Sequence, residues 1–152
     1  MKILIVLTLL IGFLWVTQDE PTIDGLNELK SIVKEYAVSK NENFISIYID
    51  NIKDIEKKSN CEIKIYNAMK RNNIYEINYN NRGSIESVSF MLGFFFGNNK
   101  SYAYSSNGYT EAVQVKSVND FIDKFRTNQK EQYFSICEKL EQQNWFYCEN
   151  NH

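Results

Sequence analysis

Histidine is nearly absent from this sequence, which holds one copy, His152, at its last position. A general base has to be held against its substrate, and the last residues of a chain fray. The composition therefore excludes Ser-His-Asp and Cys-His catalysis and argues against a zinc site. Loops of the Walker type and GxGxxG motifs are missing as well, so we expect no cofactor and no metal.

A strong net charge is also missing. The chain has 17 basic and 19 acidic residues, which gives a formal charge of −2. Such a balance creates no field that would gather nucleic acid, so we expect no nucleic-acid partner. The hydrophobic content of 43% is too high for a disordered chain, and the aromatic content of 14% favours strands.

The opening apolar run extends from Ile3 to Val16 and contains 14 residues (16 − 3 + 1). As a helix it would be about 21 Å long, against about 30 Å of hydrocarbon, which is typical of a signal-peptide core. Lys2 precedes the run and acids follow it, which favours export of what comes after. The small residues of a cleavage site are missing, so an uncleaved single-pass anchor is the other interpretation.

We therefore predict a signal peptide or a single transmembrane anchor over residues 1–17, with residues 3–17 in the membrane. Residues 22–152 are expected to form one domain outside the cytoplasm, held at the cytoplasmic membrane or released into the periplasm or the medium. A buried helix of a cytosolic protein is the remaining interpretation of the run. No cysteine follows it, which argues against a lipoprotein anchor.

Hydrophobic periodicity predicts helices in the first half of the chain, and strands with one further helix in the second half. Apolar residues three and four apart indicate helices over residues 23–39, within 59–73 and within 117–128. A strand through residues 62–66 (EIKIY) is the alternative to the second of these helices. The stretch 41–59 fits either a strand, because Ile45, Ile47 and Ile49 alternate, or a helix, which its charged continuation favours. From residue 74 the period changes to two, and the pair Asn107-Gly108 predicts a type I′ hairpin between strands 101–105 and 109–115.

The predicted fold class is α+β. An N-terminal export or membrane helix and two to three further helices precede an antiparallel meander sheet of four to six strands, which ends in a C-terminal hairpin.

The three cysteines are Cys61, Cys137 and Cys148. If residues 142–143 form the turn of the last hairpin, facing residues have numbers that sum to 285, and 137 + 148 = 285. A cross-strand disulfide between Cys137 and Cys148 is therefore expected outside the cytoplasm, where such bonds persist. Cys61 is expected to be a small buried apolar residue.

Aromatic side chains on the predicted sheet are candidates for contact with a partner, because tyrosine and tryptophan are enriched at interface hot spots. Ordinary packing inside the sheet explains the same pattern. The candidates are Tyr102, Tyr104, Tyr109, Trp145, Phe146 and Tyr147.

With the common enzyme chemistries excluded and export predicted, a non-catalytic protein-binding domain is the first functional hypothesis, such as an immunity or inhibitor protein. A small secreted hydrolase that uses carboxylates, among Glu76, Glu86 and Glu111, is the second. An accessory subunit of an envelope complex, bound through its membrane helix, is the third. The protein partner is not identified by the sequence.

Overall fold

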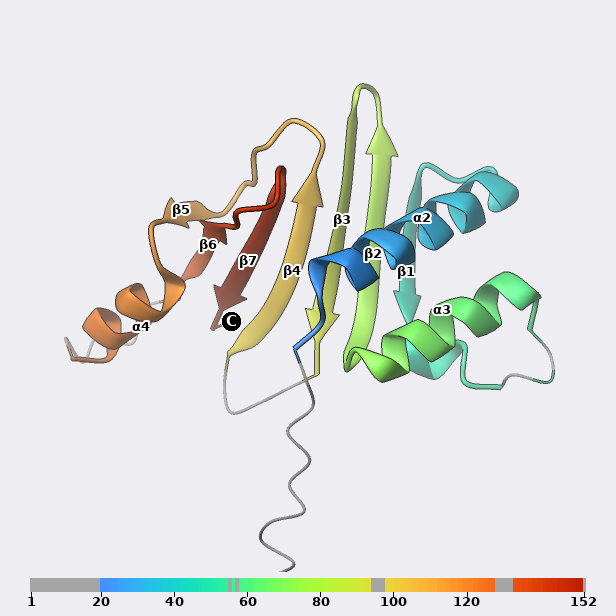
Figure 1. The fold of residues 1–152 in the computed structure, drawn as a ribbon, viewed down its shortest axis with the longest axis horizontal. Helices are drawn as coiled ribbons and strands as arrows, with labels where there is room; N and C mark the ends of the chain where they lie inside the picture. The colour runs from blue at the N-terminus through green and yellow to red at the C-terminus, as the bar shows by residue number, and fades with distance from the viewer. Residues whose placement is uncertain (1–19, 55, 57, 94–97, 128–132, 152) are drawn as a thin grey trace, which may run out of the picture.

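The computed structural model describes residues 20–54, 56, 58–93, 98–127 and 133–151 (Figure 1). The predicted signal or anchor, residues 1–17, lies outside the described residues. Among the residues that are described, no helix is long and apolar enough to cross a membrane. The α+β class is confirmed, with helices α2 (Ile23–Lys40), α3 (Asn60–Arg71) and α4 (Val118–Thr127), and a 3-10 turn η1 (Ile49–Asn51).

One sheet of seven strands contains all the described strands and is larger than predicted. The strands lie in the order β1-β2-β3-β4-β7-β6-β5, and every neighbouring pair is antiparallel except β5 and β6. The last strand in sequence therefore lies inside the sheet, between β4 and β6. Their bounds are β1 (Phe44–Tyr48), β2 (Ile74–Arg82), β3 (Ile85–Leu92), β4 (Asn99–Ser105), β5 (Val113–Val115), β6 (Ser135–Lys139) and β7 (Trp145–Asn150).

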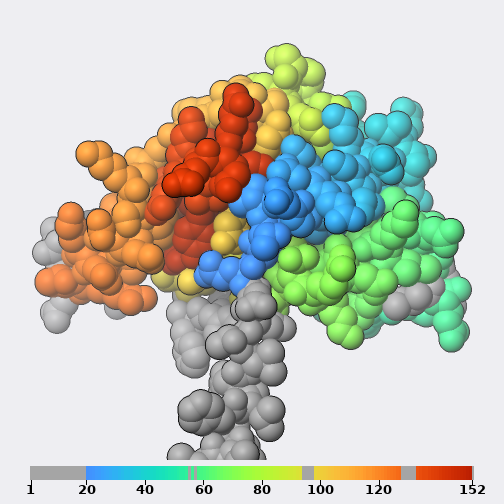
Figure 2. Space-filling model, viewed as in Figure 1, coloured from blue at the N-terminus to red at the C-terminus, as the bar shows by residue number. Residues whose placement is uncertain are grey.

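The helices cover one face of this sheet. Leu26, Leu29 and Val33 form the buried side of α2 and pack with inward side chains of the central strands, such as Ile77 and Phe90. Figure 2 shows α2 lying between α3 and the β6–β7 hairpin on this side. Helix α4 packs on the same face at the β5–β6 end, in a separate cluster. Because side chains alternate along a strand, the opposite face carries a different set of residues, most of them polar.

Local sequence signals explain where α2 and α3 begin. Thr22 precedes α2 and its side chain accepts a hydrogen bond from the Gly25 N–H, as its sequence position predicts. Helix α3 begins with a capping box, in which the Ser59 Oγ accepts from the Glu62 N–H and the Glu62 carboxylate accepts from the Ser59 N–H at 2.9 Å. The Ser59 N–H and the Ser59 hydroxyl both donate to the Glu62 carboxylate, and these two bonds lower the pKa of Glu62 because they favour its charged form.

The helix favoured over residues 41–59 is wrong. Phe44–Tyr48 is instead the edge strand β1, followed by the short η1. Ile45 and Ile47 are both buried beneath the helices, whereas their neighbours are exposed. The alternation of isoleucines was the correct signal, because pairing with β2 buries both of them on one face.

The hairpin predicted at Asn107-Gly108 is also wrong. Gly108 has the positive φ expected of a turn, at 69°, but β4 is followed by a long crossing and not by a paired strand. The Asn107 side-chain oxygen accepts from the Ser105 hydroxyl and from the Tyr109 N–H, which redirects the chain. β7 then occupies the position beside β4, and the chain continues to β5 at the far edge.

The capping box at the start of α3 gives a test of the fold. We expect Ser59→Ala to lower the free energy of unfolding by about 1 kcal/mol, because the Glu62 N–H loses its partner. Urea unfolding followed by circular dichroism measures this change. Ser31→Ala, on the exposed side of α2, is the matched control and should leave stability nearly unchanged. Equal effects of the two substitutions would contradict the assigned cap.

Candidate functional site

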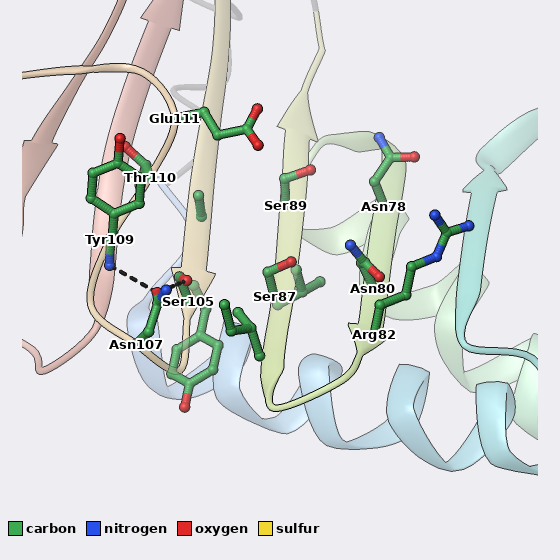
Figure 3. A pocket seen from close by; sticks show the side chains of 14 residues that line it. Asn78, Asn80, Arg82, Ser87, Ser89, Ser105, Asn107, Tyr109, Thr110 and Glu111 are labelled. Atoms are coloured by element: carbon green, nitrogen blue, oxygen red, sulfur yellow. Dashed lines mark hydrogen bonds between the residues drawn. The ribbon is translucent and has the colours of Figure 1, made fainter.

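The uncovered face of the sheet contains a hollow of about 530 Å³ (Figure 3). Its floor is formed by β2, β3 and β4, and one wall is the chain that leaves β4 toward β5. The lining side chains in the middle of the floor are small or amide-bearing, whereas larger ones such as Arg82 and Ile85 stand at the strand ends that border it. Those on the floor include Asn78, Asn80, Ser87, Ser89 and Ala103.

Two parallel rows of polar groups line the floor. Strand pairing places Asn80 opposite Ser87 and Asn78 opposite Ser89. Both ends of the Asn78 amide already have a partner, because its Oδ1 accepts from the Ser46 hydroxyl and its Nδ2 donates to Glu76 Oε1 at 2.8 Å. The remaining hydroxyls and amides of these rows are therefore the groups that can serve a ligand.

Asn80 carries the clearest sign of unused binding capacity. Its Oδ1 is buried and accepts no hydrogen bond from any described residue. A buried polar atom without a partner costs about 1–3 kcal/mol, and native proteins rarely keep one without a reason. Asn80 lines the hollow, but its Oδ1 is itself covered, so a donor from outside could reach this acceptor only after the side chain turns.

Charges of opposite sign border the hollow. Figure 3 shows Glu111 on the side of the crossing chain and Arg82 on the side of β2, with the two serines between them. Arg82 also lies over the ring of Phe44, 5.8 Å from its centroid. A ligand that spans the hollow would meet a carboxylate at one end and a guanidinium at the other.

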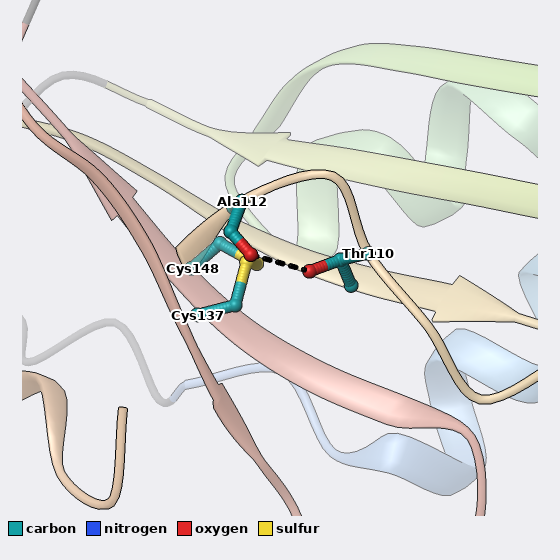
Figure 4. Close-up of a disulfide and its surroundings, with 4 residues drawn as sticks. All are labelled: Thr110, Ala112, Cys137 and Cys148. Carbon is teal, nitrogen blue, oxygen red and sulfur yellow. Dashed lines mark hydrogen bonds between the residues drawn. A yellow bond between two sulfur atoms is a disulfide. The ribbon is translucent and has the colours of Figure 1, made fainter. Parts of the chain in front are cut away.

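The crossing chain that walls the hollow rests on the disulfide. A bond joins Cys137 and Cys148, as predicted, and Figure 4 shows it beside Thr110 and Ala112. The Thr110 hydroxyl donates to the Ala112 carbonyl at 3.4 Å, which closes a local turn above the sulfurs. The bridge therefore lies beneath the segment that contributes Thr110 and Glu111 to the hollow.

The register of the last hairpin agrees with the sequence argument, although its turn is longer. Cys137 faces Cys148, and Lys139 faces Phe146, so facing residues sum to 285 in both pairs. The loop comprises residues 141–144 instead of 142–143 alone, and Asn144 takes a positive φ of 68°. Both loops have the same centre, which is why the register survives. Cys61 is a free, partly buried thiol.

Most of the six predicted aromatic residues pack inside the sheet. Tyr102, Trp145 and Phe146 are buried, and Tyr104 and Tyr147 are partly buried. Trp145 stacks near Phe90, with ring centroids 6.1 Å apart, and donates from Nε1 to Asn27 on α2. Tyr109 is 61% exposed and borders the hollow, so it is the one of the six that projects well into solvent. Contact of the others with a partner stays a prediction.

A cluster of tyrosines and acids lies on the helix-covered face. The Tyr147 hydroxyl donates to Glu149 Oε1 at 2.6 Å, and Tyr102 donates to Glu20 at 3.4 Å. Glu149 is only 4% exposed and also pairs with Lys100 at 3.5 Å. Burial, followed by these acceptors, raises the pKa of Tyr102 to about 12, and the same causes raise the pKa of Tyr147.

The three carboxylates proposed for a hydrolase do not converge. Glu76 and Glu111 belong to the uncovered side, whereas Glu86 faces the helices, where it pairs with Lys34 at 3.0 Å and accepts from Tyr79 at 3.2 Å. Within the described ranges, no group of three His, Cys, Asp or Glu side chains could hold a metal ion.

Comparison with models of known families, with curated proteins and with solved structures finds no match for this chain. The function is therefore argued from the geometry of the site.

Sequence reasoning missed the polar floor of the hollow. A signal existed, because Ser87 and Ser89 alternate with the apolar Val88 and Phe90, and Asn78 and Asn80 flank Tyr79. Such alternation predicts one polar face for each strand. It does not reveal that the polar faces of neighbouring strands remain uncovered together.

The cysteine pairing predicts a specific labelling pattern. In the unreduced native protein, alkylation should modify Cys61 at most, and after reduction and unfolding it should modify three thiols. Replacing both bridged residues (Cys137→Ala with Cys148→Ala) should lower the free energy of unfolding by about 3 kcal/mol, since it removes a constraint on the unfolded chain. Three labelled thiols before reduction, measured by mass spectrometry, would contradict the bridge.

The tyrosine clusters predict delayed ionisation. Burial raises the pKa of Tyr36, Tyr79 and Tyr102 from 10.0 to about 12, and that of Tyr147 moves in the same direction. The fold prefers their neutral form, so the stability they contribute is present below pH 10.0 and is lost as pH rises toward about 12.

Ultraviolet titration of tyrosinate measures this delay. The late component should be absent from the urea-unfolded chain and should shrink in Tyr102→Phe and Tyr147→Phe. Tyr109→Phe is the control, because Tyr109 is exposed. A native titration curve identical to the unfolded one would show that these hydroxyls are not held as described.

Proposed function

We propose that this chain is a non-catalytic protein-binding domain, exported or held at the outer side of the cytoplasmic membrane, which binds its partner in the hollow on the uncovered face of the sheet. The observation that carries this proposal is the buried Asn80 Oδ1, which has no partner among the described residues. If the Asn80 side chain turns toward the hollow, a bound protein segment that donates a hydrogen bond to this atom would remove an unfavourable term from the free protein.

The surroundings of the hollow support a protein ligand. Tyr109 and Ile85 border it and are exposed by 61% and 42%. Interfaces combine such apolar and aromatic side chains with a few well-placed polar groups, which here are Ser87 and Ser89. Arg82 and Glu111 at opposite sides would fix the orientation of a bound segment through charge.

A domain that covers a surface of its partner can inhibit it, which is how an immunity or inhibitor protein works. The predicted leader would place this action outside the cytoplasm.

Asn80→Leu separates binding from folding. This substitution removes the unpaired acceptor and keeps a side chain of similar size, so stability should stay level or rise by up to about 1–3 kcal/mol. Binding of the partner should fall about tenfold, because its donor loses the acceptor, and this loss corresponds to about 1.4 kcal/mol.

The measurement uses the full chain as bait in a membrane extract of the source cells, with quantitative mass spectrometry of captured proteins. Ser89→Arg, which fills the hollow, should abolish the capture that the unchanged chain shows. Ser31→Arg, exposed on α2 in the helix layer, is the matched control and should retain it. Equal capture by the unchanged chain, Asn80→Leu and Ser89→Arg would refute the proposed site.

A further inference from the structure

Strand β1 presents a free main-chain edge. It pairs with β2 on one side, and no described strand lies on its other side. The Asn81 N–H donates to the Asn43 carbonyl at 2.7 Å, which identifies the hydrogen-bonded pairs of this ladder. Because hydrogen-bonded and non-bonded positions alternate in an antiparallel pair, Phe44, Ser46 and Tyr48 direct their N–H and C=O groups outward.

This edge lacks the usual protection of exposed strands. Natural edges carry a proline, a lysine, a bulge or only a very short strand. The sequence of β1, FISIY, contains none of these residues and its register with β2 has no shift. The other edge strand, β5, has only 3 residues and is blunted by its length. An unprotected edge on one side of the sheet is an opportunity for strand addition.

The five residues of β1 are complementary to themselves. If a second copy pairs antiparallel about Ser46, facing residues have numbers that sum to 92, so Ser46 faces Ser46 (46 + 46) and Phe44 faces Tyr48 (44 + 48). All three outward-directed residues then face each other, which gives two main-chain bonds for each facing pair. This register uses every free N–H and C=O of the strand.

Side chains match in the same register. Phe44 and Tyr48 project on the uncovered face, where they are 48% and 44% exposed. Across the interface, the Phe44 ring of each copy would meet the Tyr48 ring of the other. Ile45 and Ile47, on the helix side, would face each other as well (45 + 47 = 92). Aromatic and β-branched cross-strand pairs are the ones that stabilise antiparallel sheets.

Charges beside the edge suit a second copy of the same chain. A groove of about 400 Å³ runs along β1 and is lined by two basic and two acidic side chains, Lys40, Lys58, Glu42 and Glu62, so its net charge is zero. Glu42 would face Asp50 beyond the strand, but Lys53 already pairs with Asp50 at 3.3 Å. No uncompensated field opposes the approach of a copy.

We propose that two copies of this protein associate through their β1 strands, antiparallel and centred on Ser46, so that their sheets become continuous. The two-fold axis is perpendicular to the sheet, which places both uncovered faces, with their hollows, on the same side. Such a dimer would offer two sites to a partner. The dimer does not depend on the proposed function, since it needs no partner.

Charge exchange tests this register with the full chain in mild detergent. Residue 44 of one copy faces residue 48 of the other. Two copies of a variant that carries both Phe44→Lys and Tyr48→Lys should therefore repel each other, and so should two copies of a variant that carries both Phe44→Glu and Tyr48→Glu. Analytical ultracentrifugation should give a dimer for the unchanged chain, monomers for each charged variant alone, and a heterodimer when the two variants are mixed. Val113→Lys, exposed on the opposite edge strand β5, is the matched control and should remain dimeric.

A covalent test is independent of the charged variants and of their folding. Ser46→Cys should form a cross-linked dimer on mild oxidation, because the two residues face each other at the axis, whereas Ser31→Cys on α2 should not. A monomeric unchanged chain, charged variants that remain dimeric, or a mixture that fails to associate would overturn the proposal. Cross-linking of Ser46→Cys to a different protein would instead assign the edge to a foreign strand, which also overturns it.

Discussion

The structure depends on the insertion of β7 between β4 and β6. This strand pairs along its length with β4 and also carries β6, so it joins the first four strands to the C-terminal part of the sheet. Trp145 anchors it to the helix layer, where the indole packs near Phe90 and Tyr104 and bonds to Asn27 on α2. Burial of a side chain of this size dominates the local packing energy.

The candidate site is a consequence of that insertion. With β7 beside β4, the chain leaving β4 has no neighbouring place in the sheet and must cross to the far edge. It crosses above the bond between Cys137 and Cys148 and supplies Thr110 and Glu111 as one wall of the hollow. Topology, more than any local motif, thus creates the concave surface.

The two faces of the sheet have different surroundings. Helices α2 and α3 bury the apolar side chains of one face, including Ile77 and Tyr79. Over β2, β3 and β4 the other face presents short polar side chains such as Asn80, Ser87 and Ser89, which tolerate water and leave the hollow. One packed face and one solvated face are common in antiparallel sheets, and here the solvated face is the one that we propose for binding.

Local interactions were predictable from the sequence. The caps at Thr22 and Ser59 each join residues three positions apart at a helix start, so they depend only on the local sequence. The pairing of Cys137 with Cys148 was equally accessible, because a hairpin register follows from the centre of its turn. From the sequence alone, the hollow could be recognised only as an alternation of polar residues within single strands.

The sequence by itself determined which residues could form helices, where these begin, and how the final hairpin pairs, because these depend on contacts between near neighbours. Only the tertiary structure decided that β1 is a strand, that β4 pairs with β7, and which face stays uncovered. Strand pairing between distant segments is chosen by competition among several possible partners, and the outcome depends on the burial of the whole sheet against its helices.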